Sequence, residues 1–195
     1  GVNIWEAVDI ANLHPRVEIL KPGIGVGGHC ISVDPWFFVE KAPDLTQLIR
    51  MAREVNDAQP HYVVDLVKKA VDGELKGKTV AALGLAYKAN VDDVRESPAV
   101  RVVKLLEAEG AIVKPFEPFK PEVVVDGVTS VASLAEAVNN ADVVLFLVAH
   151  AQFKELTPLK LSTMTNTKVI VDGVLVTDRE DWRSSEYQIF DLGVG

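Results

Sequence analysis

The stretch Thr79-Val-Ala-Ala-Leu-Gly-Leu-Ala-Tyr-Lys-Ala-Asn-Val-Asp-Asp-Val-Arg-Glu-Ser-Pro98 contains a strand pattern, a loop and the start of a helix. Residues 79–83 form a short apolar run, which is typical of a buried strand. Ser97 is a good helix cap, and Pro98 suits the first helical position. We therefore expect a strand, a connecting loop, and a helix that ends at Gly110.

The alternation of strand and helix patterns continues toward the carboxyl end. Further strands are predicted at residues 111–116, 142–148 and 168–171, and a helix is predicted at residues 134–139. Strands that alternate with helices indicate a mainly parallel sheet with helices on both faces. The sequence thus predicts an α/β fold, with a Rossmann-like domain over residues 77–195.

Helical patterns precede this domain. Asn3 is a cap for a helix that should stop near His14-Pro15. Residues 45–71 have apolar positions at helical spacing, and Pro60 is expected to open a second helix within them. We predict that residues 1–76 form a separate segment of helices and loops ahead of this domain. Packing of their apolar face on a partner subunit and packing on the chain's own domain are equally compatible with the pattern.

A glycine-rich loop, Lys21-Pro-Gly-Ile-Gly-Val-Gly-Gly-His-Cys-Ile-Ser-Val-Asp-Pro35, carries the only cysteine of the chain. Cys30 is a candidate nucleophile, although a lone cysteine is more often a small buried residue. The run Gly23–Gly28 matches G-x-G-x-x-G, but no predicted strand precedes it, and Asp34-Pro35 disfavours a helix after it. We therefore reject a dinucleotide fingerprint here. The run Trp36–Val39 is interpreted as a strand or a buried turn.

The loop after residues 79–83 is a candidate anion site. Ligands of open α/β sheets bind beyond the carboxyl ends of the strands. Lys88 and Arg95 stand there, just before a predicted helix amino terminus, where cations and the helix dipole favour phosphate groups. In the alternative interpretation the loop is solvated, and Asp92 and Asp93 neutralise the two cations.

Composition restricts the partners. The 195 residues carry a net charge of −8, which repels nucleic acid but leaves room for a small anionic ligand held by a few cations. No apolar run reaches the ~20 residues of a membrane span, and the first residues do not resemble a signal peptide. The four histidines are scattered and predict no metal site. A single cysteine excludes an intramolecular disulfide, so we expect a cytoplasmic protein.

The glycine-rich loop and the segment Gly84–Pro98 resemble, in this order, two signatures of the nucleotide-sugar 6-dehydrogenases, the UDP-glucose/GDP-mannose dehydrogenase superfamily. His29-Cys30 and Val33–Phe37 are most similar to its UDP-N-acetylmannosamine dehydrogenase branch. UDP-glucose enzymes usually carry serine before the cysteine and lysine at the place of Val33. The resemblance covers essentially the whole chain but lacks the family's amino-terminal Rossmann domain with its NAD fingerprint. It thus implies a carboxy-terminal fragment, made of central dimer-forming helices and a UDP-sugar-binding domain.

The resemblance implies a reaction and roles for four residues. A UDP-N-acetylhexosamine, with UDP-N-acetylmannosamine as first choice, is oxidised at its C6 alcohol to the uronate by NAD. Cys30 matches the cysteine that forms a thiohemiacetal and then a thioester, and Asp34 matches an aspartate that positions or activates water. Lys88 matches a lysine that holds the substrate, and Arg95 matches an arginine at the cofactor. The resemblance also implies a homodimer and no turnover by this chain alone.

Other substrate-binding positions follow from the same resemblance: Arg16, Gly25, Gly27, Gly28 and His29. Arg16 is the weaker match, because its spacing from the cysteine differs from the family pattern. An arginine that often follows Asp-Gly in the family is replaced by Val174, and Arg179 is a possible substitute.

Two other functions remain open on the residues alone. The chain is compatible with a non-catalytic module that binds nucleotide sugars or dimerises. A cysteine hydrolase or acyltransferase would instead need a base near Cys30, for which His29, His61 and His150 are available. Replacement of Cys30 separates the first two functions, because only a dehydrogenase loses oxidation while it keeps binding.

Overall fold

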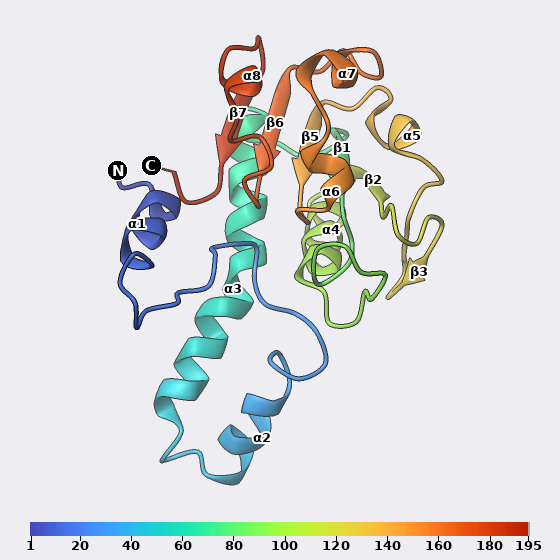
Figure 1. Cartoon of the computed structure of the whole chain (residues 1–195). Helices are drawn as coiled ribbons and strands as arrows, with labels where there is room; N and C mark the ends of the chain where they lie inside the picture. The colour runs from blue at the N-terminus through green and yellow to red at the C-terminus, as the bar shows by residue number, and fades with distance from the viewer. Residues whose placement is uncertain (195) are drawn as a thin grey trace.

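A parallel sheet forms the centre of the computed structural model, which describes residues 1–194 (Figure 1). Its five strands lie in the order β2-β1-β5-β6-β7, and every pair is parallel. The strands are β1 (Thr79–Leu83), β2 (Ile112–Phe116), β5 (Val143–Phe146), β6 (Val169–Asp172) and β7 (Gln188–Asp191). A small antiparallel hairpin joins β3 (Val124–Val125) to β4 (Val128–Thr129). The predicted α/β class with a mainly parallel sheet is confirmed.

Helices cover both faces of the sheet. The helices are α1 (Ile4–Ala11), α2 (Asp34–Lys41), α3 (Gln47–Ala70), α4 (Pro98–Ala108), α5 (Leu134–Val138), α6 (Ala151–Lys154), α7 (Pro158–Ser162) and α8 (Glu180–Arg183). Val80 and Ala82 of β1 face a core shared with α3 and α4. Ala81 and Leu83 face a second core, shared with α5 to α8. Because successive side chains of a strand point to opposite faces, β1 is apolar throughout.

Two helix starts follow their predicted caps. The Ala99 N–H donates to the Ser97 side chain at 3.2 Å, and the Trp5 N–H donates to the Asn3 side chain at 3.0 Å. Both polar side chains satisfy a backbone donor that has no partner within its helix. The indole of Trp5 also donates to the Leu192 carbonyl at 2.7 Å. This bond ties α1 to the segment after β7, so the two ends of the chain lie side by side (Figure 1).

The structure corrects the prediction that Pro60 opens a second helix. α3 is one helix of 24 residues, with Pro60 inside it. Interior proline costs a helix about 3 kcal/mol, because a backbone hydrogen bond is lost. Val63, Val64 and Val67 follow Pro60 and are buried against the sheet. Each such burial stabilises by about 1.5 kcal/mol or more, so tertiary packing outweighs the local cost.

The prediction of a strand or buried turn at Trp36–Val39 is wrong. These residues belong to the helix α2, and Asp34-Pro35 forms its first turn. Proline is tolerated there because the first helical N–H groups have no partner within the helix. Residues 12–33 contain neither helix nor strand, so the glycine run follows no strand and the rejection of a dinucleotide fingerprint stands.

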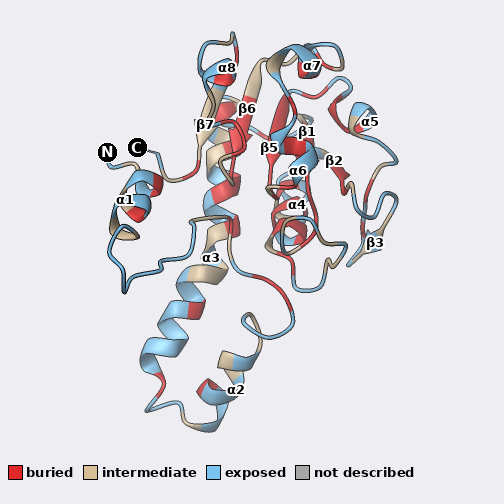
Figure 2. Cartoon of the chain, viewed as in Figure 1, coloured by how far each residue is buried: buried red, intermediate tan, exposed pale blue. Residues whose placement is uncertain are grey.

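The two halves of α3 have different surroundings. Its carboxy-terminal half packs on the sheet, whereas its amino-terminal half and α2 extend away from the sheet and are largely exposed (Figures 1 and 2). Exposed apolar side chains of this projecting part are Phe37, Phe38, Leu45, Leu48, Ile49, Met51 and Val55. Packing on the chain's own domain therefore buries the apolar face of the carboxy-terminal half of α3 only. Among residues 1–194, none of the helices combines the length and apolarity of a bilayer-spanning segment.

Two aspartates face each other where β6 and β7 end. Asp172 is buried and accepts hydrogen bonds from the N–H and hydroxyl of Thr177, each at 2.7 Å. Its partner in register is Asp191, which has a buried Oδ1 without a hydrogen-bond partner among residues 1–194. Burial, followed by the charges of Asp172 and Asp178, raises the pKa of Asp191 to about 6.

This raised pKa predicts a pH dependence of stability. Asp191 binds its proton more tightly in the folded state, so the stability it contributes is complete below pH ~4 and is lost as the pH rises through about 6. Asp191→Asn is expected to stabilise the chain at pH 8 by about 1 kcal/mol after discount for solvent screening, and to change nothing at pH 4. Urea unfolding at both pH values measures this difference.

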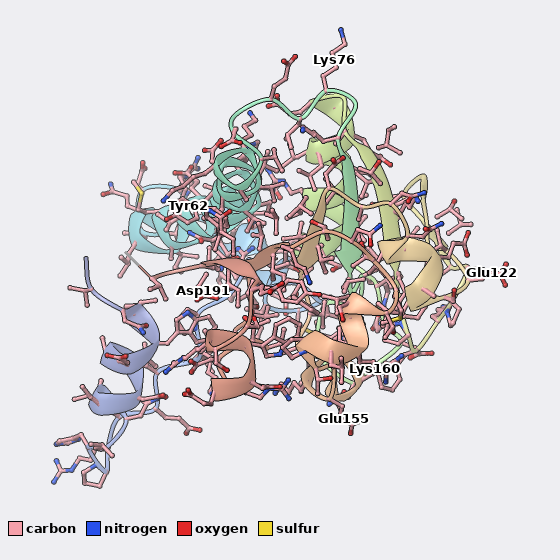
Figure 3. All side chains as sticks on the ribbon, turned by 90° about the horizontal axis from the view of Figure 1, so that it is seen from above. Tyr62, Lys76, Glu122, Glu155, Lys160 and Asp191 are labelled. Carbon is pink, nitrogen blue, oxygen red and sulfur yellow. The ribbon has the colours of Figure 1, made fainter. Side chains whose placement is uncertain are left out.

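The control for this experiment is Glu155→Gln, the same change of charge at the exposed rim of the molecule. In Figure 3 Asp191 lies toward the middle of the molecule, whereas Glu155 lies at its periphery. An equal gain at pH 4 and pH 8, or an equal gain in the control, would contradict the raised pKa of Asp191.

Candidate functional site

The glycine-rich loop lies directly against the segment that follows β1. A Cβ atom added at Gly27 would collide with the Glu96 carbonyl and lie 2.7 Å from Pro98 Cδ. At Gly28, where φ is +89°, an added Cβ would lie 3.0 Å from the ring of Tyr87. Glycine is required at both positions because the two segments approach so closely. The two motifs that are far apart in sequence thus form one structural unit.

α3 holds the same loop from another side. The Val26 N–H donates to Asn56 Oδ1 at 3.0 Å. Asn56 lies one turn before Pro60, and Pro60 has no N–H with which to bond the Asn56 carbonyl. The side chain of a helix residue therefore fixes the backbone of the loop that leads to Cys30.

Cys30 and Asp34 lie at the two ends of one tight turn. The Cys30 carbonyl accepts the N–H groups of Val33 at 3.1 Å and of Asp34 at 2.8 Å. Cys30 is exposed, and Asp34 begins α2 as an exposed residue. Within residues 1–194 no histidine forms a hydrogen bond with Cys30. The arrangement offers an accessible thiol near a carboxylate, without the base that a cysteine hydrolase needs.

Arg95 is paired with Asp93 beside this turn. Its guanidinium donates to the Asp93 carboxylate, with the shortest contact at 2.6 Å, and this hydrogen bond lowers the pKa of Asp93 to about 2. The same bond raises the pKa of Arg95, and the charges of Asp93, Tyr87 and Cys30 contribute to this rise. The alternative interpretation, in which an aspartate neutralises the charge of a loop cation, is therefore correct for Arg95. Lys88, by contrast, is exposed and forms no ion pair in the described part of the chain.

A pocket of about 880 Å³ lies between the glycine-rich loop, α3 and the carboxyl ends of β1 and β5. Its lining includes three lysines, Lys21, Lys88 and Lys154, against one carboxylate, Asp9. The pocket is thus locally cationic in a chain whose net charge is −8. Such an enclosure suits a compact anion such as a diphosphate.

The structure brings some of the predicted site residues to this pocket and places others beside it. Gly25 and Lys88 line it. Gly27 and Gly28 are buried where the loop contacts Tyr87 and Pro98, and the exposed residues His29, Cys30 and Asp34 follow them. Arg16 lies in an exposed turn after α1, outside the lining, where its N–H donates to the His14 ring. The roles of all these residues stay predictions. Within residues 1–194 no group of His, Cys, Asp and Glu side chains forms a metal site.

Sequence reasoning missed a buried carboxylate at the edge of this site. Glu117 follows β2 and is fully buried. Its Oε2 accepts the N–H groups of Leu85 at 2.7 Å and Ala86 at 2.8 Å, and its Oε1 accepts the Phe119 N–H at 3.0 Å. Burial alone would raise the pKa of Glu117, but hydrogen bonds from His150, Leu85 and Phe119 lower it. The available signal was an acidic residue directly after the second strand, where dinucleotide folds bind ribose.

His150 connects this carboxylate to the Lys88 loop. It is fully buried, and its Nε2 lies 3.2 Å from Glu117 Oε2. Its Nδ1 accepts the Asn90 N–H at 2.9 Å. The Asn90 side chain in turn accepts the Ala151 N–H at 2.8 Å, at the start of α6. The loop after β1 and the start of α6 are thus joined by two hydrogen bonds, one donated by each segment.

Family models match both parts of the chain. Residues 81–179 match the UDP binding domain of the UDP-glucose/GDP-mannose dehydrogenase family, and residues 1–58 match the central domain of that family. The chain belongs to this family. The resemblance inferred from the two motifs is therefore confirmed, and Arg179 falls within the matched UDP binding domain. The Arg179 guanidinium donates to the carbonyls of Lys154 and Leu156, so it is committed to the fold.

Individual relatives of the UDP-glucose/GDP-mannose dehydrogenase family are similar over most of the chain. The UDP-N-acetyl-D-mannosamine dehydrogenase of Methanocaldococcus jannaschii is 44% identical over 198 residues, which cover 100% of this chain and 45% of that protein. The NDP-N-acetyl-D-galactosaminuronic acid dehydrogenase of Ralstonia nicotianae is 47% identical over 176 residues, which cover 88% and 40%. The solved structure of UDP-D-ManNAc dehydrogenase from Pyrococcus horikoshii superposes with a TM-score of 0.84 at 33% identity and covers 99% and 44%. The chain spans less than half the length of these relatives.

Proposed function

We propose that this chain is the nucleophile-bearing and UDP-sugar-binding part of an NAD-dependent UDP-sugar 6-dehydrogenase. The observation that carries the proposal is the cationic pocket, which is lined by Lys88 and by the glycine-rich loop. The same loop carries Cys30. The substrate class is a UDP-N-acetylhexosamine, with UDP-N-acetylmannosamine as first choice, because several relatives carry that name. The product is the corresponding uronate.

In this proposal Cys30 acts on the aldehyde formed from the C6 alcohol. Its sulfur bonds to C6, the thiol proton passes to the carbonyl oxygen, and a thiohemiacetal results. Loss of a hydride from C6 to the nicotinamide acceptor and of the hydroxyl proton to solvent gives a thioester. Water positioned by Asp34 then attacks, which releases the carboxylate and restores the thiol. Lys88 holds the substrate in the pocket. Arg95, the proposed cofactor contact, is held by Asp93.

NAD, when bound, supplies the acceptor for the hydrides of the two oxidations. The described residues do not form the core of a dinucleotide site. The G-x-G-x-x-G run follows no strand, and Glu117, at the position of the ribose-binding acid, is occupied by the N–H groups of its own domain. We therefore assign the main NAD site to a part of the longer enzyme outside this chain, to which Arg95 adds one contact. The chain alone is proposed not to complete the oxidation.

The same proposal covers the oligomeric state of the protein and its cellular compartment. The exposed apolar residues of α2 and the amino-terminal half of α3 are proposed as the contact of a homodimer, because such a patch is otherwise costly in water. Residues 1–76 would then supply the active-site loop and dimer helices, and residues 77–195 the UDP-sugar domain. The single, free cysteine fits the cytoplasm, which is the proposed compartment.

Calorimetric titration of this chain with UDP tests the nucleotide site. We expect binding of UDP and of UDP-N-acetylmannosamine, and none of GDP. Lys88→Ala is expected to weaken UDP binding by about tenfold or more, because it removes a charge-assisted hydrogen bond to the ligand. Lys160→Ala removes an exposed lysine at the rim of the molecule and should leave the affinity unchanged (Figure 3).

Equal affinity for UDP and GDP would contradict recognition of the uracil base by this domain. Failure of the unmodified chain to bind UDP would overturn the proposal that it carries the nucleotide site. Equal UDP affinity of the parent and Lys88→Ala would remove Lys88 from that site.

A further inference from the structure

We propose that Glu117, His150 and Asn90 form a clasp that positions Lys88 for the ligand. The clasp is defined by the hydrogen bonds of these three side chains to the loop after β1 and to the start of α6. None of the three residues lines the pocket, so they act through Lys88 and are positioning residues. This inference rests on the proposed function, because it concerns the same UDP-sugar site.

The first element of the clasp is an inward-facing charge. Glu117 binds the N–H groups of Leu85 and Ala86, which are themselves buried donors. In a dinucleotide fold, the acidic residue at this position faces outward to a ribose. Here the Glu117 carboxylate is hydrogen-bonded to groups of its own domain: the N–H groups of Leu85, Ala86 and Phe119 and the ring of His150. These four donors stabilise its charged form. The start of the Lys88 loop is therefore fixed to the end of β2.

The second element is the tautomer of His150. Its Nδ1 accepts the Asn90 N–H and so carries no proton. Nε2 therefore carries the single ring proton and donates it to Glu117. The neutral ring is thus bonded to the buried Glu117 carboxylate on one side and to the Asn90 N–H on the other, so it holds the end of the Lys88 loop in one position relative to that carboxylate. The two bonds are separable, because glutamine can replace the Nε2 donor and asparagine can replace the Nδ1 acceptor.

The third element is the short distance along the chain between the two fixed points. Glu117 holds the Ala86 N–H, and His150 holds the Asn90 N–H, so only residues 87–89 lie between them. Lys88 is in the middle of this span, exposed, and faces the pocket without an ion pair in residues 1–194. A backbone fixed before binding reduces the entropy lost when the ligand is bound. The clasp thus pre-organises the one predicted lysine of the site.

The clasp also fixes a second side of the pocket. Asn90 accepts the Ala151 N–H, and the His150 carbonyl accepts the Lys154 N–H at 3.1 Å. Lys154 belongs to the same pocket lining as Lys88. Stability alone is a weak reason for such a network, because apolar residues of similar volume often replace a buried charged pair at no cost. Fixed placement of two cations around one ligand is a sufficient reason.

A double-mutant cycle on this 195-residue chain tests the inference, with UDP affinity as the readout. His150→Gln keeps a donor for Glu117 and loses the acceptor for Asn90. We expect it to weaken UDP binding about tenfold in the parent chain and to have no further effect in a Lys88→Ala background. His150→Asn, which keeps that acceptor, is expected to retain most of the affinity. Nitrogen chemical shifts of His150 are expected to show a protonated Nε2 and an unprotonated Nδ1.

The controls separate positioning from general loss of stability. Leu161→Ala removes a fully buried side chain of α7 that takes no part in the clasp, and its UDP affinity should equal that of the parent. If the substitutions at His150 prevent folding, Asn90→Gly removes only the side-chain acceptor, and the φ of +62° at this position suits glycine. Asn90→Gly is expected to weaken UDP binding several-fold in the parent chain and to have no further effect in a Lys88→Ala background.

Three results would overturn the inference. One is unchanged UDP affinity in His150→Gln, or in Asn90→Gly where that variant is needed. Another is an equal loss of affinity with and without Lys88. The third is a proton on Nδ1. Absence of UDP binding by the unmodified chain is a different result, because it overturns the proposed function first and the inference with it.

Discussion

Cys30→Ser is expected to lower the rate of uronate formation by a factor on the order of 10⁴ in the dehydrogenase completed to the length of its relatives. The serine hydroxyl ionises far less readily than a thiol, so attack on the C6 aldehyde becomes the slow step. Affinity for the UDP-sugar should stay within about twofold, because Cys30 lies outside the pocket lining. Turnover is measured by uronate formed per enzyme, and affinity by calorimetry.

The matched control is Ile31→Val, a conservative change at the exposed neighbour of Cys30. It should leave both turnover and affinity at the parent values. Parent-like turnover in Cys30→Ser would contradict a thiohemiacetal on this residue. Loss of UDP-sugar affinity in Cys30→Ser would instead indicate that the cysteine contributes to binding.

Gly84→Ala is expected to destabilise the chain by about 3 kcal/mol. Gly84 directly follows β1 and has a φ of +97°, which side-chain-bearing residues rarely adopt. An added Cβ would lie 2.5 Å from Val148 Cβ and 3.0 Å from the Val148 backbone nitrogen. Backbone strain and overpacking each cost about 1–3 kcal/mol, and neither can relax without moving β5. Urea unfolding measures the loss as a lower midpoint.

Gly23→Ala is the control for this substitution. An added Cβ at Gly23 would meet no atom within 4 Å, and its φ is not in the left-handed region. Its stability should stay within about 1 kcal/mol of the parent. A similarly small change in Gly84→Ala would contradict the close approach of the β1 end to β5. A large loss in both variants would point to an effect on the unfolded chain.

Several elements were predictable because their signals are local. β1 and α4 are marked by an apolar run, a serine cap and a proline at the first helical turn, and all three act within a few residues. The alternation of strand and helix patterns was sufficient for the parallel sheet. The two sequence motifs were sufficient for the family, which the family models confirm. The placement of Lys88 at the carboxyl end of a strand also followed from this pattern.

Other elements were not predictable because they depend on packing between distant segments. Pro60 lies inside α3 since the valines after it are buried on the sheet. The run Trp36–Val39 is helical although its residue types also suit a strand. Opposite surroundings for the two halves of α3 cannot be read from one continuous apolar pattern. Each of these outcomes is a competition between local preference and tertiary burial.

Local sequence thus determined the strands β1, β2, β5 and β6, the starts of α1 and α4, the family, and the identity of Cys30 and Lys88 as candidates. Only the tertiary structure showed that the glycine-rich loop packs on Tyr87 and that Arg95 is paired with Asp93. It alone revealed the clasp, whose members come from three separate connections of the sheet. The physical reason is that hydrogen bonds between buried side chains and loop backbones carry no periodic signal along the chain. They arise where the fold brings the ends of parallel strands to one edge.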